Sequence, residues 1–180
     1  MESKLFTPVT FGPLTLRNRT IRSAAFESMC PGNAPSDMLL DYHRSVAAGG
    51  IGMTTVAYAA VTQSGLSFDR QLWMRPEIIP GLRRLTDAIH AEGAAAGIQL
   101  GHCGNMSHKS ICGCMPVGAS SGFNLYSPTF VRGLRADELP EMARAYGRSV
   151  NLAREAGFDS VEIHAGHGYL ISQFLSPSTN

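Results

Sequence analysis

Apolar positions recur along this chain with two different spacings. Continuous or alternating apolar runs predict strands at residues 19–25, 51–58 and 95–100, and a fourth strand that contains Val161 and Ile163. Three stripes at helical spacing, each followed by a glycine, predict helices between these strands. The stripes consist of Leu39, Tyr42 and Val46, of Ile78, Leu82, Leu85 and Ile89, and of Leu139, Met142, Ala143, Tyr146, Val150 and Ala153.

Short apolar runs on either side of Gly12 and Pro13 predict a β-hairpin at residues 5–16, ahead of the first strand. Strands then alternate with helices, which indicates an α/β protein with a parallel sheet and right-handed crossovers. Residues 101–136 are rich in Gly, Ser and Pro and are expected to form a functional loop or cap. The alternation fits a doubly wound sheet as well as a barrel, although no GxGxxG fingerprint follows the first strand.

Composition narrows the class of protein. Of the 180 residues, 44% are hydrophobic and 16% are charged, which indicates a folded globular domain. The formal net charge of +1 gives no electrostatic reason to expect a nucleic acid or an anionic membrane as partner. No apolar run reaches the roughly 20 residues of a transmembrane helix. The N-terminus also lacks the apolar segment of a signal peptide, so we expect no membrane partner and a cytoplasmic protein.

The four cysteines, Cys30, Cys103, Cys112 and Cys114, are expected to be reduced in a cytoplasmic protein. Cys112 and Cys114 are close together, but no second pair stands at metal-ligand spacing. We therefore interpret them as ordinary loop cysteines.

The last predicted strand ends on His164, and His167 follows between Gly166 and Gly168, just before Tyr169. Chemistry in parallel α/β barrels takes place at this C-terminal end of the strands. Two neutral imidazoles can donate two N–H groups to one oxygen, and a phenol can donate a proton to a neighbouring carbon. The alternatives are packed or exposed loop histidines, or a zinc site, for which neither HExxH nor HxxEH is present.

Three segments resemble the Old Yellow Enzyme family, the flavin-dependent NAD(P)H oxidoreductases and ene-reductases. The segment with the two histidines reads HAGHGYLISQFLSPSTN and resembles the signature after that family's fourth strand. The N-terminus reads LFTPVTFGPLTLRNRTIRSA, like the family's hairpin and first strand, and GIQLGHCGN resembles its third-strand LxHxGR motif. The resemblance implies a (β/α)8 TIM barrel with FMN as cofactor and NADH or NADPH as hydride donor.

A barrel of this kind takes about 250 residues, whereas this sequence supplies a hairpin and four strands. We therefore expect residues 1–180 to be a single incomplete domain, the N-terminal half of the barrel, truncated at its C-terminus. The half that supplies the flavin's phosphate site in the family would then lie beyond Asn180.

The resemblance also implies residue roles. In the family's cycle NAD(P)H reduces FMN, and the flavin gives hydride to the β-carbon of an α,β-unsaturated carbonyl compound. His164 and His167 would hold the oxygen of this small-molecule substrate, and Tyr169 would protonate its α-carbon. His102, the histidine of the third-strand motif, is expected to be structural.

Five further residues are expected around the flavin or the substrate. The Gln99 amide offers a donor and an acceptor to the pyrimidine edge of the flavin. Ala24 and Ala25 would offer backbone groups, and the small Ala60 would let the backbone approach the ring. Phe26 cannot donate a hydrogen bond, so it is expected to pack on the ring or on the substrate.

Two other functions stay open at this stage. One is a barrel hydrolase with a histidine-bound metal. The other is a non-catalytic half-barrel that pairs with another chain, because four strands leave an open sheet edge. A homo-oligomer is also possible on these grounds.

Overall fold

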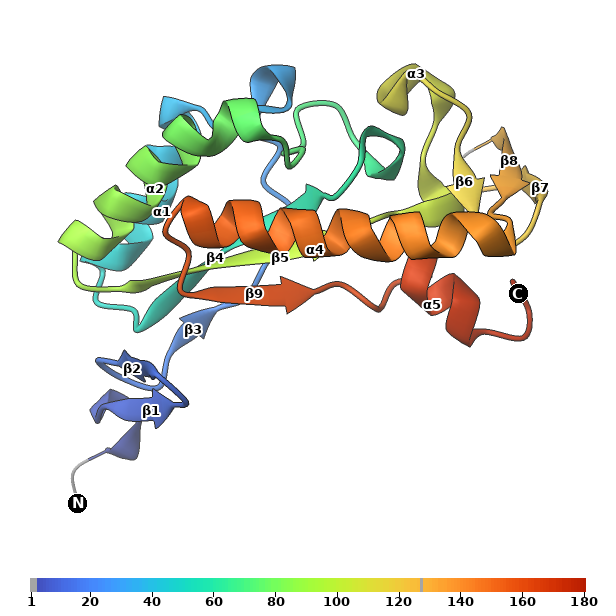
Figure 1. Ribbon diagram of the computed structural model, residues 1–180. Helices are drawn as coiled ribbons and strands as arrows, with labels where there is room; N and C mark the ends of the chain where they lie inside the picture. Colours follow the sequence, from blue (N-terminus) through green and yellow to red (C-terminus); the bar gives the residue numbers. More distant parts are fainter. Residues whose placement is uncertain (1–2, 127) are drawn as a thin grey trace.

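A computed structural model of the protein describes residues 3–126 and 128–180 (Figure 1). Its centre is a parallel sheet of four strands in the order β3-β4-β5-β9. The predicted order of strands and helices is thereby confirmed. The strands are β3 Ile21–Arg22, β4 Met53–Ala60, β5 Ala95–Gly101 and β9 Ser160–Ile163.

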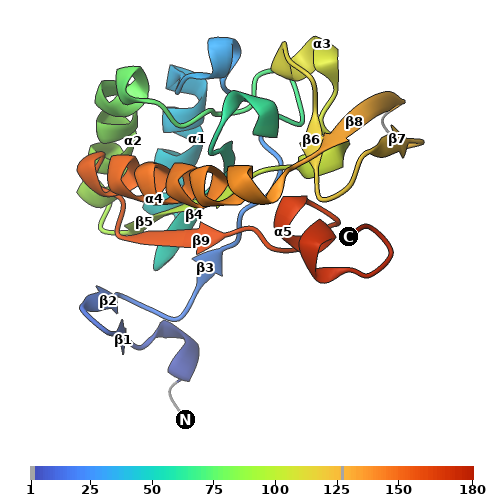
Figure 2. The same ribbon diagram turned by 45° about the vertical axis from the view of Figure 1, so that its right-hand side comes forward.

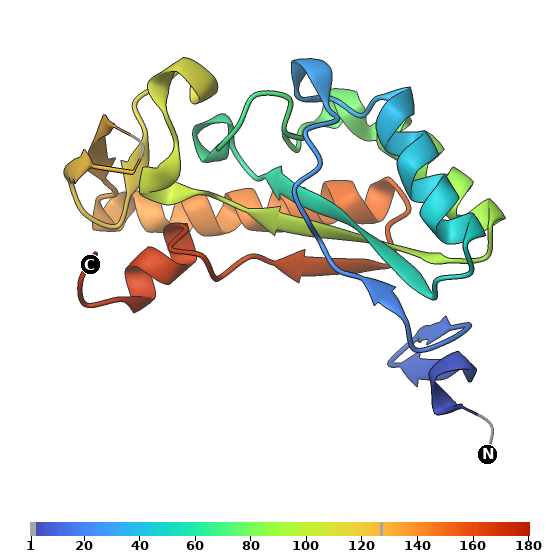
Figure 3. The same ribbon diagram turned by 180° about the vertical axis from the view of Figure 1, so that it is seen from behind.

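Three helices cover one face of this sheet, whose other face is turned toward the viewer in Figure 3. They are α1 Asp37–Ala48, α2 Ile79–Ala91 and α4 Leu139–Glu155. Helix α1 begins after Ser36, whose hydroxyl accepts a hydrogen bond from the Leu39 amide. Buried side chains between helices and sheet form the core, which includes Leu39, Val56, Leu82, Leu85, Ile89, Ile98, Leu100 and Ala153.

Two details of the sequence prediction were wrong. The strand predicted at residues 19–25 pairs with β4 only at Ile21 and Arg22, because the chain then leaves the sheet. The stripe predicted for α1 is rotated: His43 and Ala47, rather than Tyr42 and Val46, are fully buried beside Leu39. His43 points inward because its Nδ1 lies 2.8 Å from the Thr54 hydroxyl, whereas Tyr42 packs under the Arg22 guanidinium.

The N-terminal hairpin lies at the end of the sheet where the strands begin (Figures 1 and 2). Its strands are β1 Val9–Phe11 and β2 Leu14–Leu16, within the predicted residues 5–16. Arg17, just after the hairpin, donates hydrogen bonds to the carbonyls of Ala47 (2.5 Å), Ile51 (2.9 Å) and Glu92 (2.8 Å). One guanidinium thus ties the hairpin to the C-terminal ends of α1 and α2, where helix carbonyls lack partners.

The opposite end of the sheet carries most of the irregular structure (Figure 2). Residues 101–136, expected to be a loop or cap, form α3 Lys109–Cys112 and a small sheet in the order β6-β8-β7. Its strands are β6 Val117–Gly118, β7 Gly122–Asn124 and β8 Thr129–Gly133, and α5 Leu170–Leu175 follows β9. In the described ranges, none of the helices has the length and apolar character that crossing a bilayer would need.

Candidate active site

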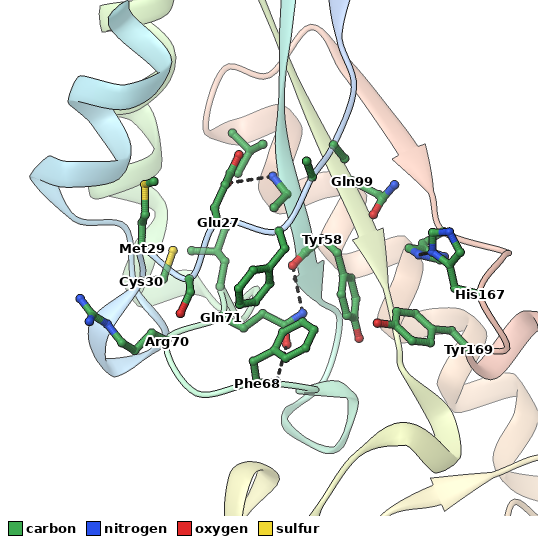
Figure 4. Close-up of a pocket in the computed structure, with 18 residues that line it drawn as sticks. Glu27, Met29, Cys30, Tyr58, Phe68, Arg70, Gln71, Gln99, His167 and Tyr169 are labelled. Carbon is green, nitrogen blue, oxygen red and sulfur yellow. Dashed lines mark hydrogen bonds between the residues drawn. The ribbon is translucent and has the colours of Figure 1, made fainter. Parts of the chain in front are cut away.

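A cavity of about 240 Å³ opens at the C-terminal ends of the parallel strands (Figure 4). His167 and Tyr169 lie on one side of it, and Met29, Cys30 and Arg70 lie on the other side. Seven of the eight predicted site residues line it, so the sequence motifs and the cavity indicate the same region of the molecule. These seven are Ala24, Ala25, Phe26, Gln99, His164, His167 and Tyr169.

The two histidines are placed by the last β9 hydrogen bond and by the turn that follows. The His164 amide donates to the Leu100 carbonyl (2.8 Å), which extends the β5–β9 pairing to the cavity. His167 adopts φ +56° and Gly168 φ +68°, both in the left-handed region. This conformation is costly for a non-glycine residue, and such strain is concentrated at functional sites.

Hydrogen bonds assign the proton positions of the histidine pair. The Gly166 amide donates to Nδ1 of His164 (3.2 Å), so the His164 proton is on Nε2. That Nε2 lies 3.0 Å from Nδ1 of His167, which accepts the bond and therefore carries its own proton on Nε2. In this hydrogen-bonded arrangement, Nε2 of His164 donates to Nδ1 of His167, and both residues line the cavity.

The site keeps His164 neutral and Tyr169 protonated. Burial, assisted by the neighbouring His167, lowers the pKa of His164 below its usual value. Burial raises the pKa of Tyr169, although a hydrogen bond with Ser67 works against this. The Tyr169 ring stacks on the His164 ring with 4.7 Å between centroids. The neutral imidazole of His164 and the protonated phenol of Tyr169 therefore lie side by side.

The structure adds aromatic walls that the sequence reasoning missed. Tyr58 lies within an irregularity of the β4–β5 pairing, between Val56 and Ala59, with its ring centroid 5.8 Å from that of His164 and 5.5 Å from that of Tyr169. Its hydroxyl donates to the Gly65 carbonyl, and burial raises its pKa well above 10. A tyrosine inside an apolar strand looks like a core residue, so only the strand-end position signals this placement.

A second wall is formed by Phe26 and Phe68, whose rings meet edge to face at 4.5 Å. Gln71, also missed, holds the segment that carries Phe68: its side chain accepts from the Ser67 amide (2.7 Å) and donates to the Tyr58 carbonyl (3.0 Å; Figure 4). The predicted packing position of Phe26 is thus at the cavity, against another aromatic ring.

The predicted cofactor-binding residues are only partly brought together. Gln99 lines the cavity, but its amide donates to the carboxylate of Glu162 on β9, a partner that the sequence did not suggest. Ala60 lies outside the cavity and is fully buried. Its amide donates to Leu72 (2.8 Å) and its carbonyl accepts from Met74 (2.9 Å), so its backbone is already paired.

His102 lies at the end of β5, away from the cavity lining. Its Nδ1 accepts from the Gly104 amide (3.0 Å), and its Nε2 lies 3.0 Å from the Ser64 hydroxyl. Burial lowers its pKa to about 4, which keeps the ring neutral. These contacts agree with the structural role expected for His102.

The cysteines are all free thiols. Of the four, Cys30 lines the cavity, and burial raises its pKa to about 12.

Within residues 3–126 and 128–180 there is no group of three or more His, Cys, Asp or Glu side chains arranged to hold a metal ion.

The fold superimposes on barrel flavin oxidoreductases, among them the Old Yellow Enzyme homologue of Zymomonas mobilis, with a TM-score of 0.91, 28% identity and coverage of 99% of this chain and 53% of that one. Morphinone reductase in complex with tetrahydroNAD gives a TM-score of 0.91 and 27% identity, covering 99% and 54%. The chain belongs to the NADH:flavin oxidoreductase / NADH oxidase family, which it matches over residues 4–180. The predicted family and the predicted half-barrel fold are confirmed.

Curated relatives carry different activities in their names. A 4,4'-dithiodibutanoate disulfide reductase of Rhodococcus erythropolis is 43% identical over 176 residues, covering 98% of this chain and 44% of that protein. An NADPH dehydrogenase of Listeria monocytogenes is 37% identical over 182 residues, covering 99% and 53%. A metal reductase of Desulforamulus reducens is 36% identical over 178 residues, covering 99% and 27%. The chain thus spans about half, or less, of the length of these relatives.

Proposed function

We propose that this protein is an FMN-dependent NAD(P)H oxidoreductase of the ene-reductase type, which reduces the C=C bond of α,β-unsaturated carbonyl compounds. The observation that carries the proposal is the histidine pair at the cavity, with 3.0 Å between the facing nitrogens of His164 and His167 and with Tyr169 stacked on His164. Family membership supports the flavin chemistry. The cytoplasmic location and the homo-oligomer expected from the sequence stay predictions.

The cavity offers groups that fit FMN. Among the described residues, the backbone N–H and C=O groups of Ala24 and Ala25 form no hydrogen bonds with the protein, although both residues line the cavity. The Gln99 amide is nearby with an acceptor and a second donor hydrogen still available. Such groups match the alternating polar edge of a flavin ring, which when bound supplies hydride chemistry that no side chain can provide.

The histidines would bind and polarise the substrate carbonyl. The Nε2–H of His164 is already a donor toward the cavity rim. For His167 to donate to the same oxygen, its proton must lie on Nδ1, so we expect substrate binding to exchange the internal histidine bond for two bonds to oxygen. Two such donors stabilise the charge that develops on that oxygen.

Tyr169 would deliver the proton. Its phenol stays protonated because burial raises its pKa. Its ring stacks on the ring of His164, which supports the proposal that its O–H would lie near the carbon next to a carbonyl held by that histidine. Tyr169→Phe should therefore slow substrate reduction while substrate binding is retained.

A disulfide reductase is the second candidate, because a relative of 43% identity is named for that activity. In this chain the one thiol that lines the cavity, Cys30, has a pKa of about 12. A thiol of this kind is almost entirely protonated near neutral pH and is a poor nucleophile for disulfide exchange. The site therefore favours carbonyl polarisation over a thiol relay.

The test uses the full-length protein, purified and loaded with FMN. The flavin is reduced anaerobically with NADPH or NADH and then mixed with 2-cyclohexenone or with 4,4'-dithiodibutanoate. We expect rapid reoxidation by the enone that the Tyr169→Phe variant loses. Reoxidation by the disulfide alone would favour the second candidate, and a protein that holds no FMN would favour the non-catalytic alternative.

A further inference from the structure

The backbone pairing between β3 and β4 ends before β4 does, and side chains from the β3 side bond to the rest of β4. The last backbone pair is Arg22 with Thr54, whereas β4 runs further. Beyond this pair, Arg22 donates from Nη1 to the Thr55 carbonyl (2.6 Å). The Ala57 amide donates to Oε2 of Glu27 (3.1 Å). The two side chains thus occupy positions on β4 that a longer β3 would occupy.

Glu27 is held in a buried cluster of charged and polar groups. Its side chain is 5% exposed, and Oε1 lies 2.7 Å from Arg22 and 3.1 Å from Nε2 of the fully buried His43. In the described part of the chain, no donor meets Oε1 in good hydrogen-bonding geometry, so these are contacts between charged or polar groups without aligned bonds. A buried carboxylate held in this way is an expensive means of stabilising a fold. Its presence points to a task other than stability.

The segment that Glu27 fastens is the one that lines the cavity. After Arg22 the chain leaves the sheet, and the backbone groups of Ala24 and Ala25 are left without partners among the described residues. Ser28, next in sequence to Glu27, adopts φ +51°, in the left-handed region that is costly for a residue other than glycine. In Figure 4 the Glu27 carboxylate points away from Tyr169 and toward β4, with its bond to that strand drawn as a dashed line.

We propose that Glu27 is a positioning residue for the flavin. By replacing the missing ladder, its carboxylate lets residues 23–26 stand free of β4 and sets the direction in which Ala24 and Ala25 present their N–H and C=O groups. The proposal rests on the proposed function, because the groups so positioned are those assigned to FMN.

The test compares Glu27→Gln, Glu27→Asp and the wild type in the full-length protein. Glutamine keeps the shape but brings an NH2 group toward Arg22, while aspartate keeps the charge but is one methylene too short to reach both Arg22 and Ala57. We measure the FMN dissociation constant by flavin fluorescence, the absorption spectrum of bound FMN, and hydrogen exchange of residues 23–30. We expect at least tenfold weaker FMN binding and a shifted spectrum for glutamine, a smaller change for aspartate, and faster exchange in both.

A matched control is Glu141→Gln on α4. Glu141 also lies 2.8 Å from two arginines, Arg144 and Arg148, but its side chain is 56% exposed. The same loss of charge there should leave FMN affinity, spectrum and exchange of residues 23–30 unchanged.

A folded Glu27→Gln variant with wild-type FMN affinity and spectrum would overturn the proposal. If that variant does not fold, the aspartate variant decides in the same way, since wild-type affinity there would mean that the exact reach of the carboxylate is irrelevant. If the wild type itself binds no FMN, the proposed function fails. Hydrogen exchange of residues 23–30 then still tests whether Glu27 orders this segment, and unchanged exchange would refute it.

Discussion

The two ends of the parallel sheet are built in opposite ways. Where the strands begin, polar groups are paired: Arg17 serves three backbone carbonyls, and Asn18 donates to the Gly50 carbonyl at 2.7 Å. Where the strands end, His167 has a strained backbone, and Ala24 and Ala25 keep unpaired backbone groups at a cavity. The two ends thus differ in how completely their polar groups are paired, and we expect the end where the strands begin to carry stability and the other end to carry the proposed chemistry, as parallel barrels allow. Substitutions at one end should therefore leave the other unchanged.

The largest effect is expected at the strand-end histidines. His164→Ala removes one of the two donors proposed to hold the substrate oxygen, and loss of one such donor lowers the rate by about 100–1000-fold. The measurement is the rate at which an enone reoxidises the reduced flavin, followed by stopped-flow absorbance. Flavin reduction by NAD(P)H and the free energy of unfolding should change little. If His164→Ala also lowered the free energy of unfolding substantially, stability and activity would not be assigned to separate ends of the sheet.

The second effect is a pH dependence of stability that arises from His102. Its pKa is about 4 in the folded protein, below the usual 6.5, so the unfolded state binds more protons between these values. Its contribution to stability is present above pH 6.5 and is lost as the pH falls toward 4, by roughly 3 kcal/mol at about 1.4 kcal/mol per pH unit. Urea unfolding at pH 7 and pH 4 measures this loss, and His102→Asn should reduce it. An equal loss in the variant would assign it to other groups.

A third effect tests the opposite end. Arg17→Ala removes three hydrogen bonds to backbone carbonyls, of which, among the described residues, only that of Ala47 keeps another donor, the Gly50 amide. Hydrogen bonds to charged groups are worth roughly 1.5–3 kcal/mol. We expect a loss of about 2–3 kcal/mol in the free energy of unfolding, with unchanged FMN affinity in the surviving folded protein. Arg17→Lys should recover only part of the stability, because a single ammonium cannot reproduce the planar fork. If the fully folded Arg17→Ala protein bound FMN more weakly than the wild type, the two ends of the sheet would not be independent.

The smallest effect compares two glycines. A Cβ at Gly101 would lie 2.7 Å from Cδ2 of Tyr58 and 3.1 Å from Cβ of His164, whereas nothing lies within 4 Å of one at Gly147. Gly101→Ala should cost about 1–3 kcal/mol through overpacking and should disturb the site. Gly147→Ala in the exposed face of α4 should gain about 0.5–1 kcal/mol. Thermal unfolding of both variants measures the contrast, and equal shifts would mean that Tyr58 is not tightly held.

The sequence predicted those parts of the fold that depend on local periodicity. The four strands, three long helices and hairpin follow from apolar spacing and turn residues, and the histidine motif identified the cavity. Long-range pairing escaped prediction: β3 pairs with β4 only at Ile21 and Arg22, and beyond this the side chains of Arg22 and Glu27 bond to β4. Ala60 lies outside the cavity and its backbone bonds to Leu72 and Met74, which no local pattern indicates.

Tyr58 and Gln71 were missed for a related reason. Each lies in a segment that looks apolar or loop-like by itself. Tyr58 contacts His164 and Tyr169, which are distant in sequence, and Gln71 is held at the cavity by its bond to the Tyr58 carbonyl. The α1 stripe failed because a buried histidine can replace an aliphatic residue when a hydroxyl such as that of Thr54 meets it. Site chemistry near a motif is readable from sequence, whereas the walls around it depend on tertiary contacts.

The most direct measurement of the central claim is the binding of a phenol to the FMN-loaded protein, followed by the change in flavin absorbance. A phenolate oxygen carries the charge that His164 and His167 are proposed to hold, so the wild type should bind it saturably. The His164→Ala/His167→Ala double variant should bind it at least about 100-fold more weakly while it retains FMN and its fold. Equal affinity in the two proteins would contradict the assignment of this histidine pair as the oxygen-binding site.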